Sequence, residues 1–145
     1  MIKLTDNPQL GFVRECVLLA RKWRAYSDEQ LRALGMTQAR ATVLYWLDVS
    51  PGTMTQRQLA DIVGIEGPTL VRQLHALEAM GIIERVPMPG DRRAKGIRLT
   101  PAAEPVLVAV REVADRMSHD CFDRLDKRRL SSATQLVRDA RAAFD

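Results

Sequence analysis

The stretch 55–100 constrains the fold most, because two short helices, a tight turn and a basic hairpin follow one another within it. Thr55 opens the first helix, and Gln58 three residues later completes a capping-box pattern. Gly64 is suited to end that helix in the left-handed conformation, and Pro68 suits the first turn of the next helix. The second helix has one apolar face, made by Leu70, Leu74, Leu77 and Gly81. This order predicts a helix-turn-helix.

The opposite face of the second helix carries a single long basic side chain. With a rotation of about 100° per residue, Arg72 lies roughly opposite the apolar face. Its neighbours on that side are small: Pro68, Thr69, Ala76 and Ala79. Small residues let a helix approach a wall closely, and the arginine can then reach base edges or phosphates of DNA. An ordinary solvated face is the alternative, although such a face usually carries several charged residues.

After Gly81 the sequence favours strands. The segments 82–86 and 97–99 are predicted to be two strands, and the loop 87–96 between them is rich in Pro, Gly and positive charge. The basic residues of this unit are Arg85, Arg92, Arg93, Lys95 and Arg98. The chain's net charge of +4 is therefore concentrated in a projecting hairpin. Next to a helix-turn-helix, the hairpin reads as a β-wing that contacts phosphates or a minor groove; for an isolated loop, a solubility role would be the simpler interpretation.

The flanking segments are predicted to be long helices. Asn7 and Pro8 are suited to begin a helix that runs to about residue 34, and Gly35 ends it. This helix is apolar on two sides, which requires cover on more than one side. Further helices are expected from Thr37, from Thr100 and from Asp126 to about Phe144. The predicted fold is mainly α with a small β-wing: a winged helix-turn-helix lobe at 36–100, and a helical dimerisation region formed by 1–35 and 101–145.

Composition and residue types exclude several other classes of protein. A chain of 145 residues is the size of one domain. No apolar run is long enough to span a membrane, and the N-terminus lacks the apolar core of a signal peptide, so a cytoplasmic location is expected. The two histidines, and the two cysteines in separate predicted elements, offer no nucleophile–base pairing, so no catalytic residue, metal site or cofactor is predicted. Asp115 and His119 stand four residues apart and are interpreted as a surface ion pair rather than metal ligands.

The motifs of the central stretch resemble those of the MarR family of bacterial winged-helix regulators, most closely its SlyA-like branch. The wing motif is Asp91-Arg92-Arg93-Ala94-Lys95 followed by Ile97, Leu99 and Thr100. The resemblance also includes 64–66, 68–72, Leu77-Glu78, Gly81 and 103–105, so that it spans about Met36 to Pro105. The outer helices match the family in pattern and length more than in identity.

The resemblance implies roles for individual residues. In the family the wing aspartate pairs with an arginine to hold the loop, which here implies Asp91 with Arg93. The arginine at the tip, here Arg92, enters the minor groove. The implied major-groove residues are Pro68, Thr69, Arg72 and Gln73. Lys95 and Arg85 are interpreted as phosphate contacts, which add affinity with little sequence preference.

The family resemblance also implies a homodimer that binds double-stranded DNA. Twofold pairing would place two recognition helices in successive major grooves, so an inverted-repeat, pseudo-palindromic operator is expected. The alternative function is a helical dimer that serves as a protein-interaction module or as a non-specific nucleoid-associated DNA binder.

Many relatives release DNA when a small aromatic anion binds. A phenolic or aromatic carboxylate effector would here be held by Arg21, Trp23, Arg24 and Tyr45. For Trp23 and Tyr45, a place in the core is the simpler interpretation. Cys16 lies where another branch of the family has a peroxide-sensing cysteine, but its apolar stripe favours a buried structural role.

Overall fold

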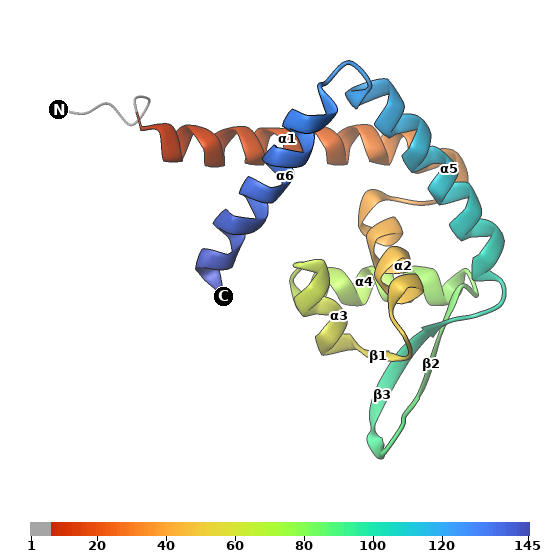
Figure 1. The fold of residues 1–145 in the computed structure, drawn as a ribbon. Coiled ribbons are helices and arrows are strands. Elements are labelled where there is room, and N and C mark those ends of the chain that lie inside the picture. The colour runs from red at the N-terminus through yellow and green to blue at the C-terminus, as the bar shows by residue number, and fades with distance from the viewer. Residues whose placement is uncertain (1–6) are drawn as a thin grey trace. The chain divides into compact units, whose positions relative to one another are not determined.

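The computed structural model describes residues 7–145 and divides into two units, with the boundary between Val113 and Ala114. The helices are α1 (Pro8–Leu31), α2 (Gln38–Val49), α3 (Gln56–Val63), α4 (Gly67–Ala79), α5 (Ala103–Phe122) and α6 (Lys127–Arg141), with short 3-10 turns η2 (Arg32–Leu34) and η3 (Ala142–Phe144). The strands are β1 (Met54–Thr55), β2 (Ile83–Met88) and β3 (Asp91–Leu99). The predicted fold class, mainly helical with a small β-wing, is confirmed (Figure 1). The first six residues of the predicted dimerisation region lie outside the described residues.

The helix ends are set by local side-chain caps, as the sequence predicts. The Asn7 side chain accepts hydrogen bonds from the N–H groups of Gln9 and Leu10, at 2.9 and 3.3 Å. Thr37 caps α2, and its hydroxyl accepts from the N–H of Arg40. Each cap satisfies backbone donors that a helix leaves without an internal partner.

The helix-turn-helix is formed by α3 and α4. The Thr55 hydroxyl accepts from the Gln58 N–H at 3.1 Å, while the Gln58 side chain accepts from the Thr55 N–H at 2.9 Å. This is the predicted capping box. Gly64 ends α3 with φ of 69°, a left-handed conformation that costs glycine little. The chain can therefore reverse between α3 and α4 within three residues.

The Thr55 cap provides a direct test of how much local structure contributes to stability. Replacement of Thr55 by alanine removes the acceptor for the Gln58 N–H, so unfolding in urea should require about 1 kcal/mol less free energy. Replacement by serine keeps the hydroxyl oxygen and should leave stability nearly unchanged. Equal stability of the alanine and serine variants would show that the capping box contributes little.

The wing is longer than the sequence indicates. The segment 87–96 was predicted to be a loop, but β2 runs to Met88 and β3 begins at Asp91, so the turn is only Pro89-Gly90. The prediction of a loop is wrong. It relied on the rule that proline usually interrupts a strand, and that rule does not hold at the edge of a sheet. In the sheet order β1-β3-β2, β2 is an edge strand, where a proline is tolerated, and the register shifts beside Pro87. In Figure 1 the β2–β3 hairpin extends away from α2, α3 and α4.

The core of the first unit joins the helix-turn-helix to the sheet. Its fully buried side chains come from α2, α3, α4 and β3: Val43, Leu44, Leu59, Leu70, Leu74, Leu77 and Ile97. The predicted apolar face of α4 is thus confirmed for its three leucines. Arg111 of α5 pairs with Asp48 of α2 and ties the first half of α5 to this core.

Two predictions about side-chain partners near α5 are wrong. Thr100 does not cap α5, which begins three residues later. Its hydroxyl instead donates to the carbonyl of Gly81, at 2.6 Å. In the second unit, His119 lies 3.1 Å from the carboxylate of Asp123 and not beside that of Asp115. Both carboxylates stand four residues from His119, one turn away on either side, so spacing alone does not choose between them. Asp126 caps α6, as predicted, by accepting from the N–H of Arg129.

Candidate nucleic-acid interface

The exposed side of α4 carries the four residues predicted to face a major groove. Pro68 and Arg72 are exposed, whereas Thr69 and Gln73 are half-buried. The Arg72 guanidinium donates to the Thr69 hydroxyl at 3.4 Å. No described residue forms an ion pair with Arg72. A guanidinium that has no carboxylate partner within the chain is available to bind an external anion.

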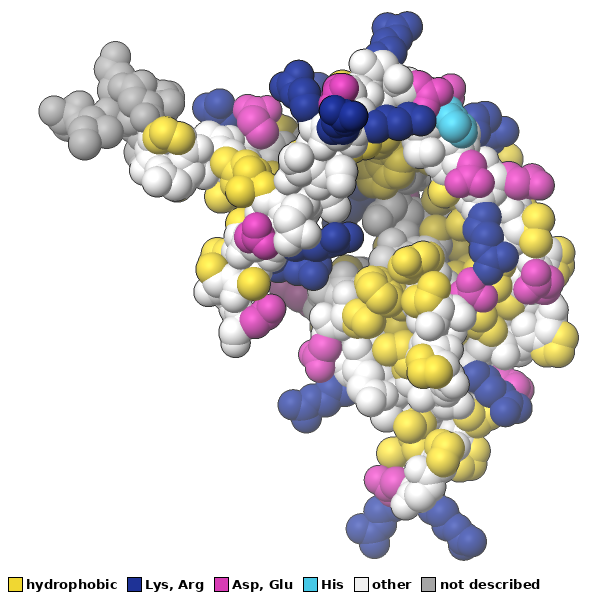
Figure 2. Space-filling model, in the orientation of Figure 1, with side chains coloured by type: hydrophobic (Ala, Val, Ile, Leu, Met, Phe, Trp, Pro, Cys, Tyr) yellow, Lys and Arg dark blue, Asp and Glu magenta, His cyan; other side chains and the backbone are white. Residues whose placement is uncertain are grey.

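The end of the hairpin carries the predicted wing residues. Asp91, Arg92, Arg93 and Lys95 are all exposed on β3. The space-filling view shows Lys and Arg side chains projecting at the far end of the hairpin (Figure 2). Among the described residues, none of these three cations has a carboxylate partner within 4 Å. The wing therefore presents positive charge to a partner outside the chain.

Asp91 shapes the tip through the backbone. Its carboxylate accepts a hydrogen bond from the N–H of Arg93 at 2.9 Å, a local turn contact over two residues. The predicted pair of residues is thus in contact, but the donor is the backbone N–H rather than the guanidinium. Within residues 7–145 the Arg93 side chain makes no ion pair with Asp91. Holding the turn in this way leaves the charge of Arg93 exposed beside that of Arg92.

Arg85, predicted to contact a phosphate, is partly buried and is engaged by other residues of the chain. It is the more buried partner of an ion pair with Glu78 of α4, at 3.4 Å, and it also donates to the side chain of Gln56 at 3.3 Å. Arg85 thereby connects β2 to both helices of the helix-turn-helix. Arg98, on the next strand, pairs with Glu84 at 2.7 Å. These two arginines are engaged within the chain, unlike Arg92 and Arg93.

The structure also reveals a contact behind the recognition surface that sequence patterns do not indicate. Arg40 of α2 donates to the side-chain oxygen of Gln73 on α4, at 3.1 Å. Nothing in the spacing of these residues signals the contact, because they stand 33 positions apart on separate helices. Gln56, which accepts from Arg85, was missed for the same reason.

The four residues predicted to hold an effector do not line one described hollow. Arg21 and Arg24 share an open hollow on the surface of α1, together with Val17, Leu18, Ala20, Lys22, Ala25 and Asp28. Tyr45 stands on α2, more than half exposed, with its ring against that of Trp46. Trp23 is half-buried and is not a lining residue.

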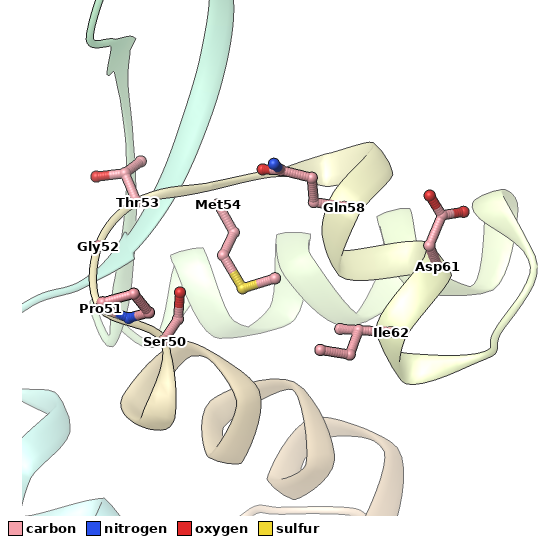
Figure 3. A pocket seen from close by; sticks show the side chains of 8 residues that line it. All are labelled: Ser50, Pro51, Gly52, Thr53, Met54, Gln58, Asp61 and Ile62. Carbon is pink, nitrogen blue, oxygen red and sulfur yellow. The ribbon is translucent and has the colours of Figure 1, made fainter.

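A second open hollow lies between the end of α2 and α3, and none of its lining residues was predicted to bind DNA or a ligand (Figure 3). It is lined by Ser50, Pro51, Gly52, Thr53, Met54, Gln58, Asp61 and Ile62. Met54 and Ile62 face the space between the loop and α3. Neither cationic nor metal-ligating clusters line this hollow, and across the described residues no group of three or more His, Cys, Asp or Glu side chains could hold a metal ion.

The recognition helix, the basic hairpin and the helical flanks define a winged helix-turn-helix protein. Residues 34–94 match the model of the MarR family. The transcriptional regulator PA3341 is 36% identical, with a TM-score of 0.83 over 92% of this chain and 97% of that one. Given that identity and coverage, the chain belongs to the MarR family of transcriptional regulators.

More distant structures share the fold. S. aureus MepR, solved as a complex with DNA, is 19% identical, with a TM-score of 0.79 over 92% of this chain and 98% of that one. CouR from Rhodococcus jostii RHA1, solved with p-coumaroyl-CoA bound, is 18% identical, with a TM-score of 0.78 over 97% and 95%. Members of the family regulate transcription rather than catalyse reactions. None of the helices described between residues 7 and 145 is long and apolar enough to cross a membrane.

Proposed function

We propose that this regulator binds a pseudo-palindromic operator as a homodimer, with α4 in the major groove and the wing in the adjacent minor groove. The observation that carries the proposal is that Arg72 on α4 and the exposed Arg92 and Arg93 on the hairpin, all in one unit, form no ion pair with any described residue. Phosphates and base edges are the external partners that such exposed arginines bind. Pro68, Thr69 and Gln73 would complete the major-groove surface, and Lys95 would contact a phosphate. Arg85, held by Glu78 and Gln56, would support the wing more than it contacts DNA.

The exposed apolar side chains of the flanking helices support the homodimer. On α1 they are Leu10, Val13, Val17, Leu18 and Leu19, and on α6 they are Leu130, Leu136 and Val137. Large apolar patches on a folded chain mark interaction surfaces. A second copy would cover them and set two recognition helices one helical turn of DNA apart. These surfaces support a division into a DNA-binding lobe at 36–100 and a dimerisation region at 1–35 and 101–145. The wing motif 91–95 is the feature that supports a place in the SlyA-like branch.

Binding to DNA of defined sequence tests this proposal. Selection of bound duplexes from random DNA should recover an inverted repeat with half-sites about 10 base pairs apart. The logarithm of the binding constant for that repeat should fall linearly with the logarithm of salt concentration, with a slope of about −0.9 per phosphate contact. Equal affinity for the repeat and for random duplex would favour a non-specific nucleoid-associated binder. Absence of DNA binding at low salt would favour a protein-interaction module.

A small aromatic carboxylate is the proposed class of effector. Arg21 and Arg24 supply two cations in the α1 hollow, and this positive charge suits the carboxylate of such an anion. A protein of the same fold, CouR, is bound to p-coumaroyl-CoA. Trp23 and Tyr45 would have to come to the ligand from outside this hollow. Titration with salicylate-like compounds should weaken operator binding, and Arg24→Ala should reduce that response. An operator affinity that no such compound changes would exclude this effector class.

A further inference from the structure

Arg40 of α2 makes two hydrogen bonds, one of them to a residue of the recognition helix. Its Nε donates to the Gln73 side-chain oxygen at 3.1 Å, and its Nη1 donates to the backbone carbonyl of Gly35 at 3.1 Å. Gly35 is itself held in a left-handed conformation, with φ of 66°, where α1 and η2 end. The guanidinium is therefore fixed by two acceptors, one of them backbone.

Arg40 lies at the start of α2, where further hydrogen bonds hold the backbone in place. Its backbone N–H is bound by the Thr37 cap, and the N–H of Gln38 donates to the Asp28 carboxylate at 2.6 Å. In addition, α2 packs against α4 within the same unit (Figure 1). Because Arg40 and Gln73 are both half-buried at this contact, water competes less for their hydrogen bond than it would on an open surface.

A guanidinium has donors only, so it selects one end of the glutamine amide. The Gln73 oxygen is turned toward Arg40, and the Nε2 group has no hydrogen-bond partner among the described residues. A free glutamine reads adenine through both ends of its amide, by accepting from N6 and donating to N7. The oxygen keeps a second lone pair, but its bond to Arg40 holds that end of the amide toward α2, so the donor end is the group that is free to turn to a base.

We infer that Arg40 is a positioning residue that fixes Gln73 as a hydrogen-bond donor, so that the operator position facing Gln73 is read as guanine rather than adenine. Guanine presents two acceptors in the major groove, O6 and N7, and no donor that would need the engaged oxygen. This inference rests on the proposed function, because it requires α4 to lie in the major groove.

The test compares base preference at a single operator position. That position is found first, as the one whose preference is lost in Gln73→Ala. Operators carrying each of the four bases there, symmetrically in both half-sites, are then titrated with the wild-type protein and with Arg40→Ala. The wild type should prefer guanine to adenine. In Arg40→Ala the guanine-to-adenine ratio of affinities should fall about tenfold, since the freed amide can make its two bonds to adenine.

A second variant keeps the inference testable if Arg40→Ala does not fold. Gln73→Glu retains an acceptor for Arg40 but has no donor, so its preference should move to cytosine, whose N4 group donates. A wild-type preference for adenine would overturn the inference. So would an equal loss of affinity for all four operators in Arg40→Ala, or no move toward cytosine in Gln73→Glu. Failure of the wild type to prefer any inverted repeat would instead overturn the proposed function itself.

Discussion

Arg72→Ala and Arg92→Ala should each weaken operator binding by about 1–3 kcal/mol while leaving the fold intact. Both side chains are exposed and make no ion pair with a described residue, so their removal disturbs no packing. Arg72 stands on the exposed face of α4, where loss of a base contact should also relax the sequence preference. Arg92 stands at the wing, where a narrow minor groove attracts an inserted arginine. Titration of the selected operator, with circular dichroism as a check on folding, measures both effects.

Arg98 supplies the matched control for these two variants. Arg98→Ala removes the same charge from the same hairpin, but its side chain is engaged by Glu84 at 2.7 Å. The control should lose less affinity than Arg92→Ala, and its base preference should be that of the wild type. If Arg98→Ala weakened binding as much as both test variants, net charge alone would explain the affinity. Unchanged operator binding in the Arg72 and Arg92 variants would remove α4 and the wing from the interface.

Gly96→Ala should destabilise the folded lobe by about 1–3 kcal/mol, because the new methyl group has no space. Gly96 is buried in the middle strand, β3, opposite Thr55 on one side and Val86 on the other. A Cβ atom there would lie 2.1 Å from Cγ2 of Thr53 and 2.7 Å from Sδ of Met88. The sulfur can move on its flexible side chain, so Thr53 is the main obstacle. Urea unfolding at a fixed protein concentration measures the loss.

The same contact suggests a rescue. Thr53→Ser removes the Cγ2 methyl that meets the added Cβ, while it keeps the hydroxyl. Combined with Gly96→Ala, it should recover a large part of the lost stability, whereas alone it should change stability little. Such non-additivity is expected only for residues in contact. A double variant as unstable as Gly96→Ala alone would show that the strain lies elsewhere in the sheet.

The local parts of the fold could be predicted from the sequence. Asn7 and Thr55 cap helices as predicted, and Thr37 and Asp126 cap helices that were predicted to begin at them. These ends could be predicted because a cap depends on backbone groups only two or three residues away. The three leucines of α4 are buried for an equally local reason, the helical period of their spacing. The predicted loop at 87–96 failed because the tolerance of Pro87 depends on which strand lies at the sheet edge, and that is a property of the assembled sheet.

The candidate site divides in the same way. The residue types on the outer face of α4 and in the wing follow from periodicity and charge, and the structure exposes Arg72 and Arg92 without internal ion pairs. The hydrogen-bond and ion-pair partners that these residues find on other elements could not be predicted from the sequence. Arg85 was expected to face a phosphate, but Gln56 and Glu78 engage it. Among the hollows described for residues 7–145, none is lined by all four proposed effector residues.

The sequence by itself determined the order of the elements, their ends and the sides that α4 turns inward and outward, because those depend on contacts within a few residues. Only the tertiary structure decided which polar groups are engaged and which remain available. The contact between Arg40 and Gln73 spans 33 positions. It exists because α2 and α4 pack together, and no spacing rule for one helix describes a side chain that reaches it from another.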